Sequence, residues 1–266
     1  MRGVKRLEKP VFDVEKQLEE QKKYNATLQH NKKQKFSTTW MYSAAALILL
    51  LIGIKFFFFP YTTTIHTEKG QNTVVTLPDH SKVMLNADSS LEYNKKSFAE
   101  DKVVELHGEA FFDVEKGASF IVNTANGNIT VLGTEFNVYS RNKSLEVHCF
   151  EGKVSVQKGN DKVMLTAGKG TKYHETKEFS IFEISDKKSS WLDGKSRFSE
   201  VPLERVIQEL ERQYIIKIDA DHVDVKRIFT GFFVHNNLEI ALKTSFDPMD
   251  IDYTFEGKKT IVLQNK

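Results

Sequence analysis

The chain has 266 residues, and its formal net charge of +2 would by itself indicate a mildly basic protein. The charge is unevenly spread, because residues 1–39 carry ten Lys and Arg against five Asp and Glu, whereas the other 227 residues carry 28 against 31. The excess of basic residues lies directly before an apolar segment. Membrane topology and attraction to anionic lipid explain basic residues at such a place, so they are not evidence of nucleic-acid binding. Cys149 is the only cysteine, so no intramolecular disulfide can form.

Residues 1–39 predict a cytoplasmic tail without a packed domain. Apolar residues between Val11 and Leu28 recur at roughly helical spacing, which predicts a helix over 11–29. Large apolar groups are too few for a core that would offset the chain entropy lost on folding. Two interpretations stay open: a solvated helical stalk, or a segment that becomes ordered on a partner.

Residues 40–60 predict a single transmembrane helix. The segment is apolar on all sides from Ala44 to Ile54 apart from one glycine, and about 20 such residues cross a bilayer core of roughly 30 Å. A cleaved signal peptide would be shorter and nearer the N-terminus, and a buried core helix would show a polar face. Because the lysines cluster before this segment, the N-terminus is expected in the cytoplasm and the C-terminal part outside it.

Residues 61–185 predict an all-β domain, because short apolar runs alternate with turn residues such as those at 78–80. A weak internal repeat, in which glycine precedes an apolar-x-Val pair, begins at Gly108, Gly133 and Gly152. The repeat favours a solenoid-like sheet, with an irregular sandwich as the alternative. The candidate strands are Val74–Leu77, Val83–Leu85, Val103–Leu106, Phe111–Val114, Phe120–Val122, Ile129–Leu132, Phe136–Val138, Leu145–Val147 and Val154–Val156.

Residues 190–266 predict a small α+β domain in the order β-α-β-β-α-β-β. Pro202 is well placed to start the first helix, Asn236 or Asn237 can cap the second, and Pro248 ends it. The expected elements are a strand at Arg197–Phe198, a helix after Pro202, strands at Ile215–Ile218 and Ile228–Val234, a helix at Leu238–Phe246, and strands at Ile251–Phe255 and Thr260–Leu263.

Four blocks of the β region together resemble the FecR family of bacterial transmembrane sigma regulators. These blocks are Leu77–Asn86, Leu106–Val114, Val131–Val138 and Glu151–Val154. The C-terminal stretch 198–263 is similar to the small domain that ends Bacteroidota-like members, which resembles the N-terminal domain of secretins and TonB-dependent transporters (the STN fold).

The resemblance implies an anti-sigma factor or sigma regulator in the bacterial inner membrane, with its C-terminal part in the periplasm. In such proteins a TonB-dependent transporter of the outer membrane, loaded with siderophore or glycan, presents a signalling domain to the C-terminal domain. Staged cleavage of the regulator then lets its cytoplasmic part control an extracytoplasmic-function sigma factor. The tail of 39 residues is shorter than the usual anti-sigma region, which leaves three alternatives. The tail binds the sigma factor as a short induced helix, the chain start is misassigned, or this member has lost sigma control.

The resemblance also implies one covalent event. Some members of the family break their own chain at a Gly-Thr bond by attack of the threonine hydroxyl on the preceding carbonyl, and Gly133-Thr134 occupies the matching motif. Other enzymatic chemistry is not predicted. The spacing of histidines suggests no metal site, and the chain lacks a glycine-rich phosphate loop, so neither metal nor cofactor is expected.

The transporter contact is predicted at an exposed edge of the C-terminal sheet, because unpaired strand edges invite strand addition. The residues predicted to bind are Ile215, Ile216, Lys217, Ile218, Arg227 and Phe229. Two other classes of function stay open: a membrane-tethered periplasmic binding or scaffold protein without transcriptional output, and a periplasmic enzyme anchored by its N-terminus.

Overall fold

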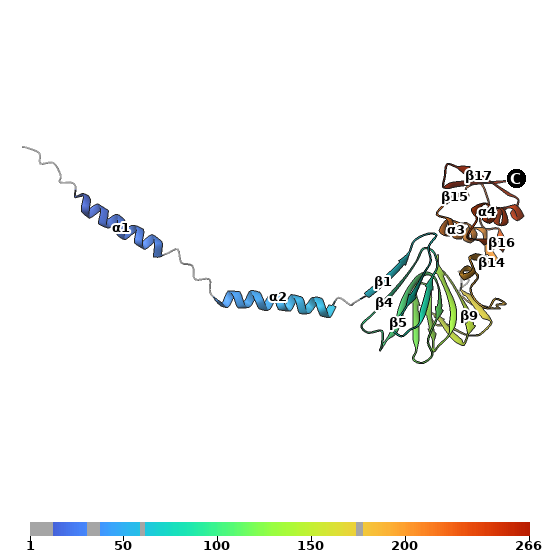
Figure 1. Cartoon of the computed structure of the whole chain (residues 1–266), viewed down its shortest axis with the longest axis horizontal. Helices are drawn as coiled ribbons and strands as arrows, with labels where there is room; N and C mark the ends of the chain where they lie inside the picture. Colours follow the sequence, from blue (N-terminus) through green and yellow to red (C-terminus); the bar gives the residue numbers. More distant parts are fainter. Residues whose placement is uncertain (1–12, 31–37, 59–61, 174–177) are drawn as a thin grey trace, which may run out of the picture. The chain divides into compact units, whose positions relative to one another are not determined.

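The computed structural model describes residues 13–30, 38–58, 62–173 and 178–266. The chain divides into two compact units, residues 1–60 and residues 61–266, each of which is described by itself. The first unit contains two helices, α1 (Val14–His30) and α2 (Thr38–Phe58) (Figure 1).

Helix α1 confirms the helix predicted in the tail, and its described side chains are exposed. Helix α2 covers most of the apolar segment. Within the described residues, no helix combines the length and the apolar character that crossing a membrane requires. The membrane span predicted at 40–60 therefore stays a prediction.

The β domain of the second unit is one sheet of 13 strands within the described residues, which folds over to enclose a core. Its main path runs β11-β10-β7-β6-β5-β8-β9-β12-β13, while β1 joins β4, β2 joins β3, and both pairs attach to β5. The strands are β1 (Thr62–Thr67), β2 (Thr73–Thr76), β3 (Lys82–Leu85), β4 (Ser89–Asn94), β5 (Lys102–Asp113), β6 (Phe120–Thr124), β7 (Gly127–Val131), β8 (Glu135–Arg141), β9 (Ser144–Glu151), β10 (Lys153–Lys158), β11 (Asp161–Thr166), β12 (Lys169–Tyr173) and β13 (Phe179–Glu183).

Strand β5 is shared by the two layers of this sheet. Its first half pairs with β4 and β6, and its second half, from Gly108 onward, pairs with β8 and β3. Gly108 has φ +105°, and a Cβ there would lie 2.9 Å from the Cα of Ser89, so only glycine fits where the sheet turns. The two predicted strands Val103–Leu106 and Phe111–Val114 are therefore one continuous strand.

The solenoid-like alternative is wrong, and the sandwich alternative describes this domain. In a solenoid each repeat contacts its sequence neighbours, whereas β5 lies beside β8 although β6 and β7 come between them in the chain. Every strand pair of this sheet is antiparallel except β5 with β6. The glycines of the apparent repeat are not equivalent, because Gly108 lies inside β5, whereas Gly133 and Gly152 lie in the connections before β8 and β10.

The core of the β domain is aromatic and lies between the two layers. Phe112 and Phe136 stack with ring centroids 4.9 Å apart, and Phe98 and Phe120 pack beside them fully buried. Cys149 is also fully buried, and burial raises the pKa of its thiol to about 11. The cysteine is therefore an unreactive part of the core, as its apolar neighbours predict.

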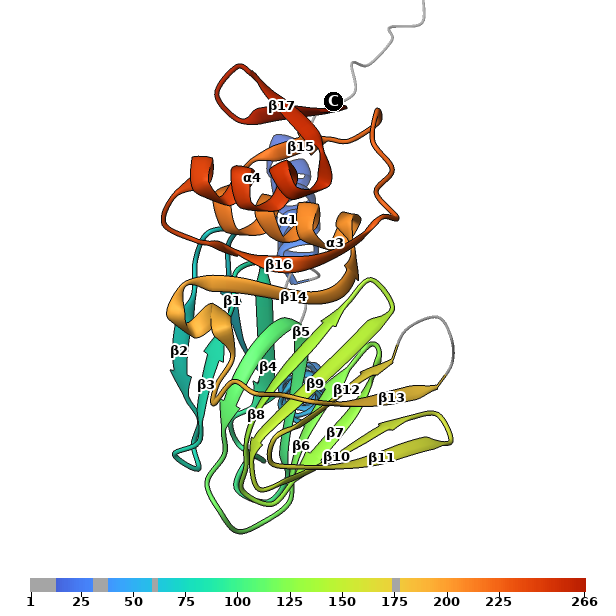
Figure 2. The same cartoon turned by 90° about the vertical axis from the view of Figure 1, so that its right-hand side faces the viewer.

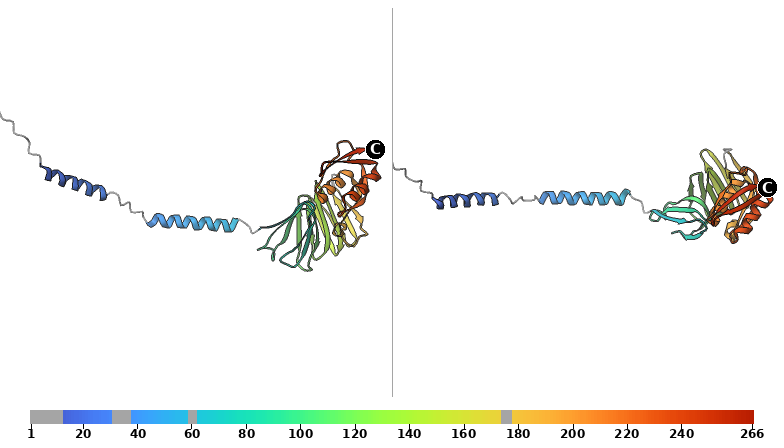
Figure 3. Two further views of the ribbon diagram at one scale, coloured as in Figure 1. Left: turned by 45° about the horizontal axis from the view of Figure 1, so that its top comes forward. Right: turned by 90° about the horizontal axis from the view of Figure 1, so that it is seen from above.

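The C-terminal domain follows the predicted order β-α-β-β-α-β-β. It has its own core and lies against the β domain (Figures 2 and 3). A two-stranded antiparallel sheet pairs β14 with β16, and a three-stranded sheet has the order β15-β18-β17. The elements are a 3-10 turn η1 (Ser190–Asp193), β14 (Lys195–Pro202), α3 (Leu203–Tyr214), β15 (Lys217–Asp219), β16 (Ile228–Val234), α4 (Leu238–Phe246), a 3-10 turn η2 (Asp247–Met249), β17 (Ile251–Glu256) and β18 (Thr260–Asn265).

The predicted helix boundaries are confirmed. Helix α3 begins directly after Pro202. The side chain of Asn237 caps α4 by accepting a hydrogen bond from the backbone N–H of Ile240 at 3.0 Å, which satisfies a donor that the first turn leaves open. Pro248 lies in the 3-10 turn that follows α4.

We predict that Gly108→Ala will destabilise the folded chain more than Gly168→Ala. Both glycines have positive φ, but only at Gly108 does the added Cβ meet backbone, since nothing lies within 4 Å at Gly168. We expect a loss of about 1 kcal/mol from Gly168→Ala and roughly 2–4 kcal/mol from Gly108→Ala, measured by urea unfolding. Equal losses would contradict the steric role of the bend.

Candidate functional site

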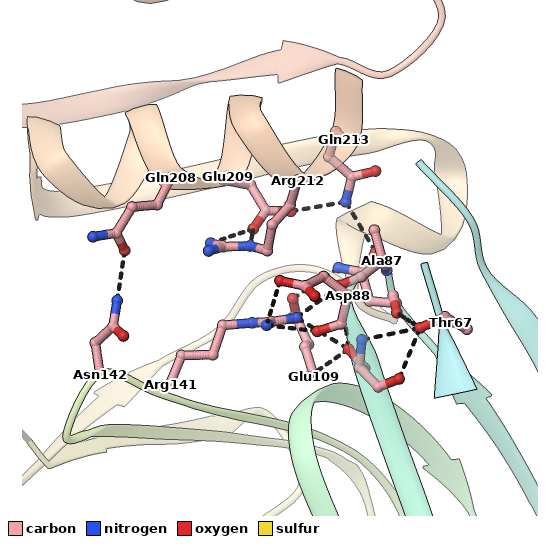
Figure 4. A network of polar contacts seen from close by, with 12 residues as sticks. Thr67, Ala87, Asp88, Glu109, Arg141, Asn142, Gln208, Glu209, Arg212 and Gln213 are labelled. Atoms are coloured by element: carbon pink, nitrogen blue, oxygen red, sulfur yellow. Dashed lines mark hydrogen bonds and ion pairs between the residues drawn. The ribbon is translucent and has the colours of Figure 1, made fainter. Parts of the chain in front are cut away.

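Several buried and partly buried polar side chains of the second unit gather where α3 lies against the β domain (Figure 4). Strands β5, β8 and β9 supply one side, and η1 and α3 supply the other. We call this region the junction. Its residues are Asn86, Glu109, Asn137, Tyr139, Arg141, Glu146, His148, Trp191, Arg205, Glu209, Arg212 and Gln213.

Glu109 stands at the centre of the junction. Its two carboxylate oxygens accept hydrogen bonds from the side-chain amides of Asn137, at 2.9 Å, and Asn86, at 2.8 Å. The amide oxygens of those asparagines accept in turn from the indole N–H of Trp191 (2.9 Å) and the amide of Gln213 (3.0 Å). One carboxylate of the β domain is therefore linked through two amides to the C-terminal domain.

The ionisation of Glu109 is influenced by a second buried carboxylate, Glu209 on α3. Burial raises the pKa of Glu109, and the negative charge of Glu209 raises it further. Burial alone would also raise the pKa of Glu209, but the charge of Arg212 and the hydrogen bond from Gln213 lower it to about 2. The guanidinium of Arg212 binds Glu209 at 2.8 and 3.0 Å. Of the two carboxylates Glu109 and Glu209, it is therefore Glu209 that carries the negative charge.

An ionic contact also joins the two domains, through Arg205 of α3. Its guanidinium binds the carboxylate of Glu146 at 2.6 Å and lies 4.1 Å from the ring centroid of Tyr139. The imidazole of His148 contacts the other oxygen of Glu146 at 2.8 Å. Burial opposes ionisation of Glu146, but Arg205 and His148 hold its pKa well below the ordinary value.

The turn between β1 and β2 ends helix α3. The backbone N–H of Gly70 donates to the carbonyl of Arg212 at 2.7 Å, which satisfies one of the carbonyls left open at the end of a helix. Ile215 then takes a left-handed conformation and stops the helix. The last turn of α3 is therefore fixed by the first turn of the β domain.

A cleft of about 700 Å³ opens beside the junction. Strands β9, β12 and β13 line one side, and β14 and β16 line the other. The floor is polar, with Glu146 and Arg205 already bound to each other. Two exposed apolar residues line the cleft: Phe232 is 44% exposed, and Ile181 is 54% exposed but lies in register with Thr171 and Val147, on the core face of its sheet.

The residues predicted to bind a partner do not form one surface. Ile216, Ile218 and Phe229 are buried in the core of the C-terminal domain, because alternate positions of a strand point inward. Ile215 and Lys217 are exposed, and Arg227 is partly exposed. Strand β15 is an edge strand, as expected, but the N–H of Ile218 on its outer side donates to the Glu211 carboxylate at 2.8 Å. That edge is therefore partly closed.

The Gly133-Thr134 bond lies just before β8, and its threonine is buried. Gly133 has φ +129°, and a Cβ there would lie 2.6 Å from the Cα of Lys116. The hydroxyl of Thr134 donates to the carbonyl of Lys153 at 3.2 Å. The position requires glycine, and the Thr134 hydroxyl is bound to Lys153; cleavage itself stays a prediction.

Sequence reasoning missed the junction, although three of its residues lie in the blocks that carry the family resemblance. Asn86 ends the first block, Glu109 lies in the second and Asn137 in the third. Asn86 and Asn137 are buried in the folded chain, and Glu109 is partly buried. The signal that could have found them is therefore a hydrogen-bonding side chain within each otherwise apolar block.

The fold and the junction define a class: a two-domain module whose buried polar groups join a β sandwich to a small α+β domain. Among the described residues, no group of three or more His, Cys, Asp or Glu side chains could hold a metal ion.

Comparison with known proteins identifies the family. The FecR protein family matches residues 63–155. Two crystal structures, at 2.50 and 1.65 Å resolution, of a candidate anti-sigma factor from Parabacteroides distasonis are each 30% identical, with a TM-score of 0.71; the matches cover 77% of this chain and 99% of those chains. No curated protein matches. The chain belongs to the FecR family, and its neighbours support a sigma-factor regulator.

We predict that Asn137→Ala will loosen the junction. The change leaves Trp191 and one oxygen of Glu109 without their partner, and a buried group without its hydrogen bond costs about 1–3 kcal/mol. The measurement is urea unfolding followed by Trp191 fluorescence in a Trp40→Phe background. Gln208→Ala is the matched control, because Gln208 lies in α3 and bonds Asn142 at the exposed margin of the same contact. A similar effect of both changes would contradict the role of Asn137.

We also predict a specific acid dependence for the Glu209 pair. The pKa of Glu209 is about 2 in the folded chain against an ordinary 4.5, so its stabilisation is present above pH 4.5 and is lost as the pH falls toward 2. Glu209→Gln should lower the unfolding free energy at pH 7 by about 3–5 kcal/mol, since Arg212 stays buried without its partner. The unfolding free energy of this variant should also fall less steeply than that of the wild type as the pH is lowered from 4.5 toward 2. Glu239→Gln, which breaks an exposed pair with Lys243, is the control. If Glu209→Gln loses unfolding free energy in acid as steeply as the wild type does, Glu209 is not the source of the acid dependence.

Proposed function

We propose that this protein is a single-span anti-sigma regulator of the bacterial inner membrane. It relays a signal from a TonB-dependent transporter of the outer membrane to an extracytoplasmic-function sigma factor. Membership of the FecR family and likeness to a candidate anti-sigma factor support sigma regulation. The sequence supports the membrane position, because an apolar segment at 40–60 separates a basic tail from the two domains.

The relay has two ends in this proposal. The N-terminal tail, with the exposed helix α1, is the sigma-binding part. The C-terminal domain receives the transporter's signalling domain in the periplasm. The single observation that carries the proposal is the family assignment of the β domain, and the junction gives a physical route from the C-terminal domain into it.

The proposal predicts that a sigma factor co-purifies with the full chain and is lost when residues 1–39 are removed. Alkaline-washed membranes should retain the full chain, which is then extracted with detergent, captured, and analysed by mass spectrometry together with the shortened form. The bound transporter should remain in both samples. Capture of the transporter with no sigma factor in either sample would instead favour the tethered periplasmic scaffold.

Self-cleavage at Gly133-Thr134 is a second proposal, favoured by the positive φ of Gly133 and the tight packing around it. In this step the Thr134 hydroxyl attacks the carbonyl of Gly133, the C–N bond between them breaks to give an ester and the free amine of Thr134, and water then hydrolyses the ester. The attack requires the two groups to be held together. Thr134→Ala should leave only full-length chain on a denaturing gel, whereas Thr171→Ala, at the second Gly-Thr pair, should leave the pattern unchanged. Fragments that persist in Thr134→Ala would refute self-cleavage.

A further inference from the structure

Helix α1 carries exposed apolar side chains along one side. Val14 is 57% exposed, and Leu18 and Leu28 are each 53% exposed. No described part of the chain covers them, because every side chain from residue 14 to residue 28 is exposed. Most helices in proteins owe their stability to the packing of an apolar face. The apolar side of α1 is therefore open to a partner.

The spacing along this side is that of a coiled coil. With Gln21 and Asn25, the three apolar residues follow one another at intervals of four, three, four and three residues, which is the alternation of a and d positions in a heptad. At about 100° per residue, the five positions lie within about 80° of one another around the helix. A stripe this narrow is typical of a coiled-coil seam, whereas a helix on a globular core has a wider apolar face. We call Val14, Leu18, Gln21, Asn25 and Leu28 the seam.

Most charged side chains of α1 lie away from the seam. Four of them occupy the outer b, c and f positions of the heptad: Lys16, Glu19, Glu20 and Lys23. Lys22 flanks the seam at an e position, and in a parallel pair of helices it faces Gln17 at a g position of the partner. This contact adds no repulsion between like charges. The charge pattern is therefore compatible with two copies of α1 meeting along the seam.

The two polar residues of the seam favour an identical partner. An amide in an apolar seam is costly unless it meets another hydrogen-bonding group at the same level. Asparagine at an a position sets the register of a coiled coil in this way. A second copy of α1, parallel and in register, places Asn25 opposite Asn25 and Gln21 opposite Gln21. Each apolar residue of the seam then also meets its own copy.

The direction of such a pair follows from the proposed function, on which this inference rests. An antiparallel pair also matches the amides, with Gln21 opposite Asn25 and Leu18 opposite Leu28. In a single-span protein, however, both copies enter one membrane in the same direction, and only residues 31–37 separate α1 from α2. The parallel pair brings both chains to the membrane at the same end. This tether also raises the effective concentration of the two helices, which matters because helices of 17 residues are marginal in free solution.

We propose that α1 forms a parallel, two-stranded coiled coil with α1 of a second copy of this chain. The seam is buried between the two copies. The charged outer side of α1 stays in solvent, where a sigma factor can still bind. The tail then links two regulators on the side of the membrane that holds the sigma factor.

Disulfide crosslinking of the full chain, in a lysate that retains the membranes, tests the pair. Cys149 is the only native cysteine and is fully buried, so the wild-type chain gives the background. Gln21→Cys and Leu28→Cys each place a thiol in the seam, and Lys23→Cys places one on the outer side as the matched control. Because a disulfide needs Cα atoms about 4.4–6.8 Å apart, oxidation with copper phenanthroline should link each seam variant about fivefold or more above Lys23→Cys.

A charge in the seam should separate the two copies. In the Gln21→Cys chain, Leu18→Glu should lower the yield of linked dimer about fivefold or more, because it buries two unpaired carboxylates face to face. Thr27→Glu adds the same charge at an outer position and should leave the yield unchanged. Equal yields from Gln21→Cys and Lys23→Cys, or a yield that Leu18→Glu does not change, would overturn the proposal.

Two further outcomes separate this proposal from its alternatives. Links between Gln21→Cys and Asn25→Cys chains, with none from Leu28→Cys, would show the antiparallel pair and refute the parallel one. A sigma factor captured by the tail without a seam-specific dimer would refute the coiled coil and leave the relay standing. A seam-specific dimer without a captured sigma factor would support the coiled coil and refute the relay.

Discussion

The buried carboxylate of Glu109 is the constraint on which the rest of the second unit depends. A carboxylate removed from water is costly unless hydrogen bonds satisfy it. Asn86 and Asn137 satisfy it from within the β domain. The amide oxygen of Asn137 accepts from Trp191 of the C-terminal part, and that of Asn86 accepts from Gln213 of the same part as well as from the N–H of Ala87. The two domains have separate apolar cores, yet the polar network is complete only when they are docked. The C-terminal domain is therefore a structural partner of the β sandwich rather than a mobile appendage.

Because the network joins the two domains through α3, a structural change in the C-terminal domain would reach the β domain through this helix. One face of the helix carries Glu209 and Arg212 toward the β domain, and its last turn is held by Gly70. Gly70 follows β1, and β1 is the first strand after residue 60 in the chain. A displacement of α3 would therefore disturb the start of the β domain directly, through a hydrogen bond rather than through a long path of side chains.

The sequence predicted the C-terminal domain better than the junction, for physical reasons. The helix after Pro202 and the cap at Asn237 are local signals, and both hold. Strands such as β1 and β12 were missed because Thr and Lys dominate them and tertiary pairing alone makes them strands. Ile216 and Ile218 were predicted to bind a partner because they lie at an expected sheet edge, but their side chains are buried in the core. The side-chain bonds between the domains join residues 54, 59 and 127 positions apart, and only the family blocks gave a hint of them.

The most direct test of this account is native-state hydrogen exchange on the full chain in detergent. If the Glu109 network joins the domains, the slowest amides of α3 and of β8 should open with the same free energy. They should also lose protection together when Glu109 is replaced by Ala. If α3 instead opens at much lower cost than β8, and Glu109→Ala changes β8 alone, the domains are independent and the account is contradicted.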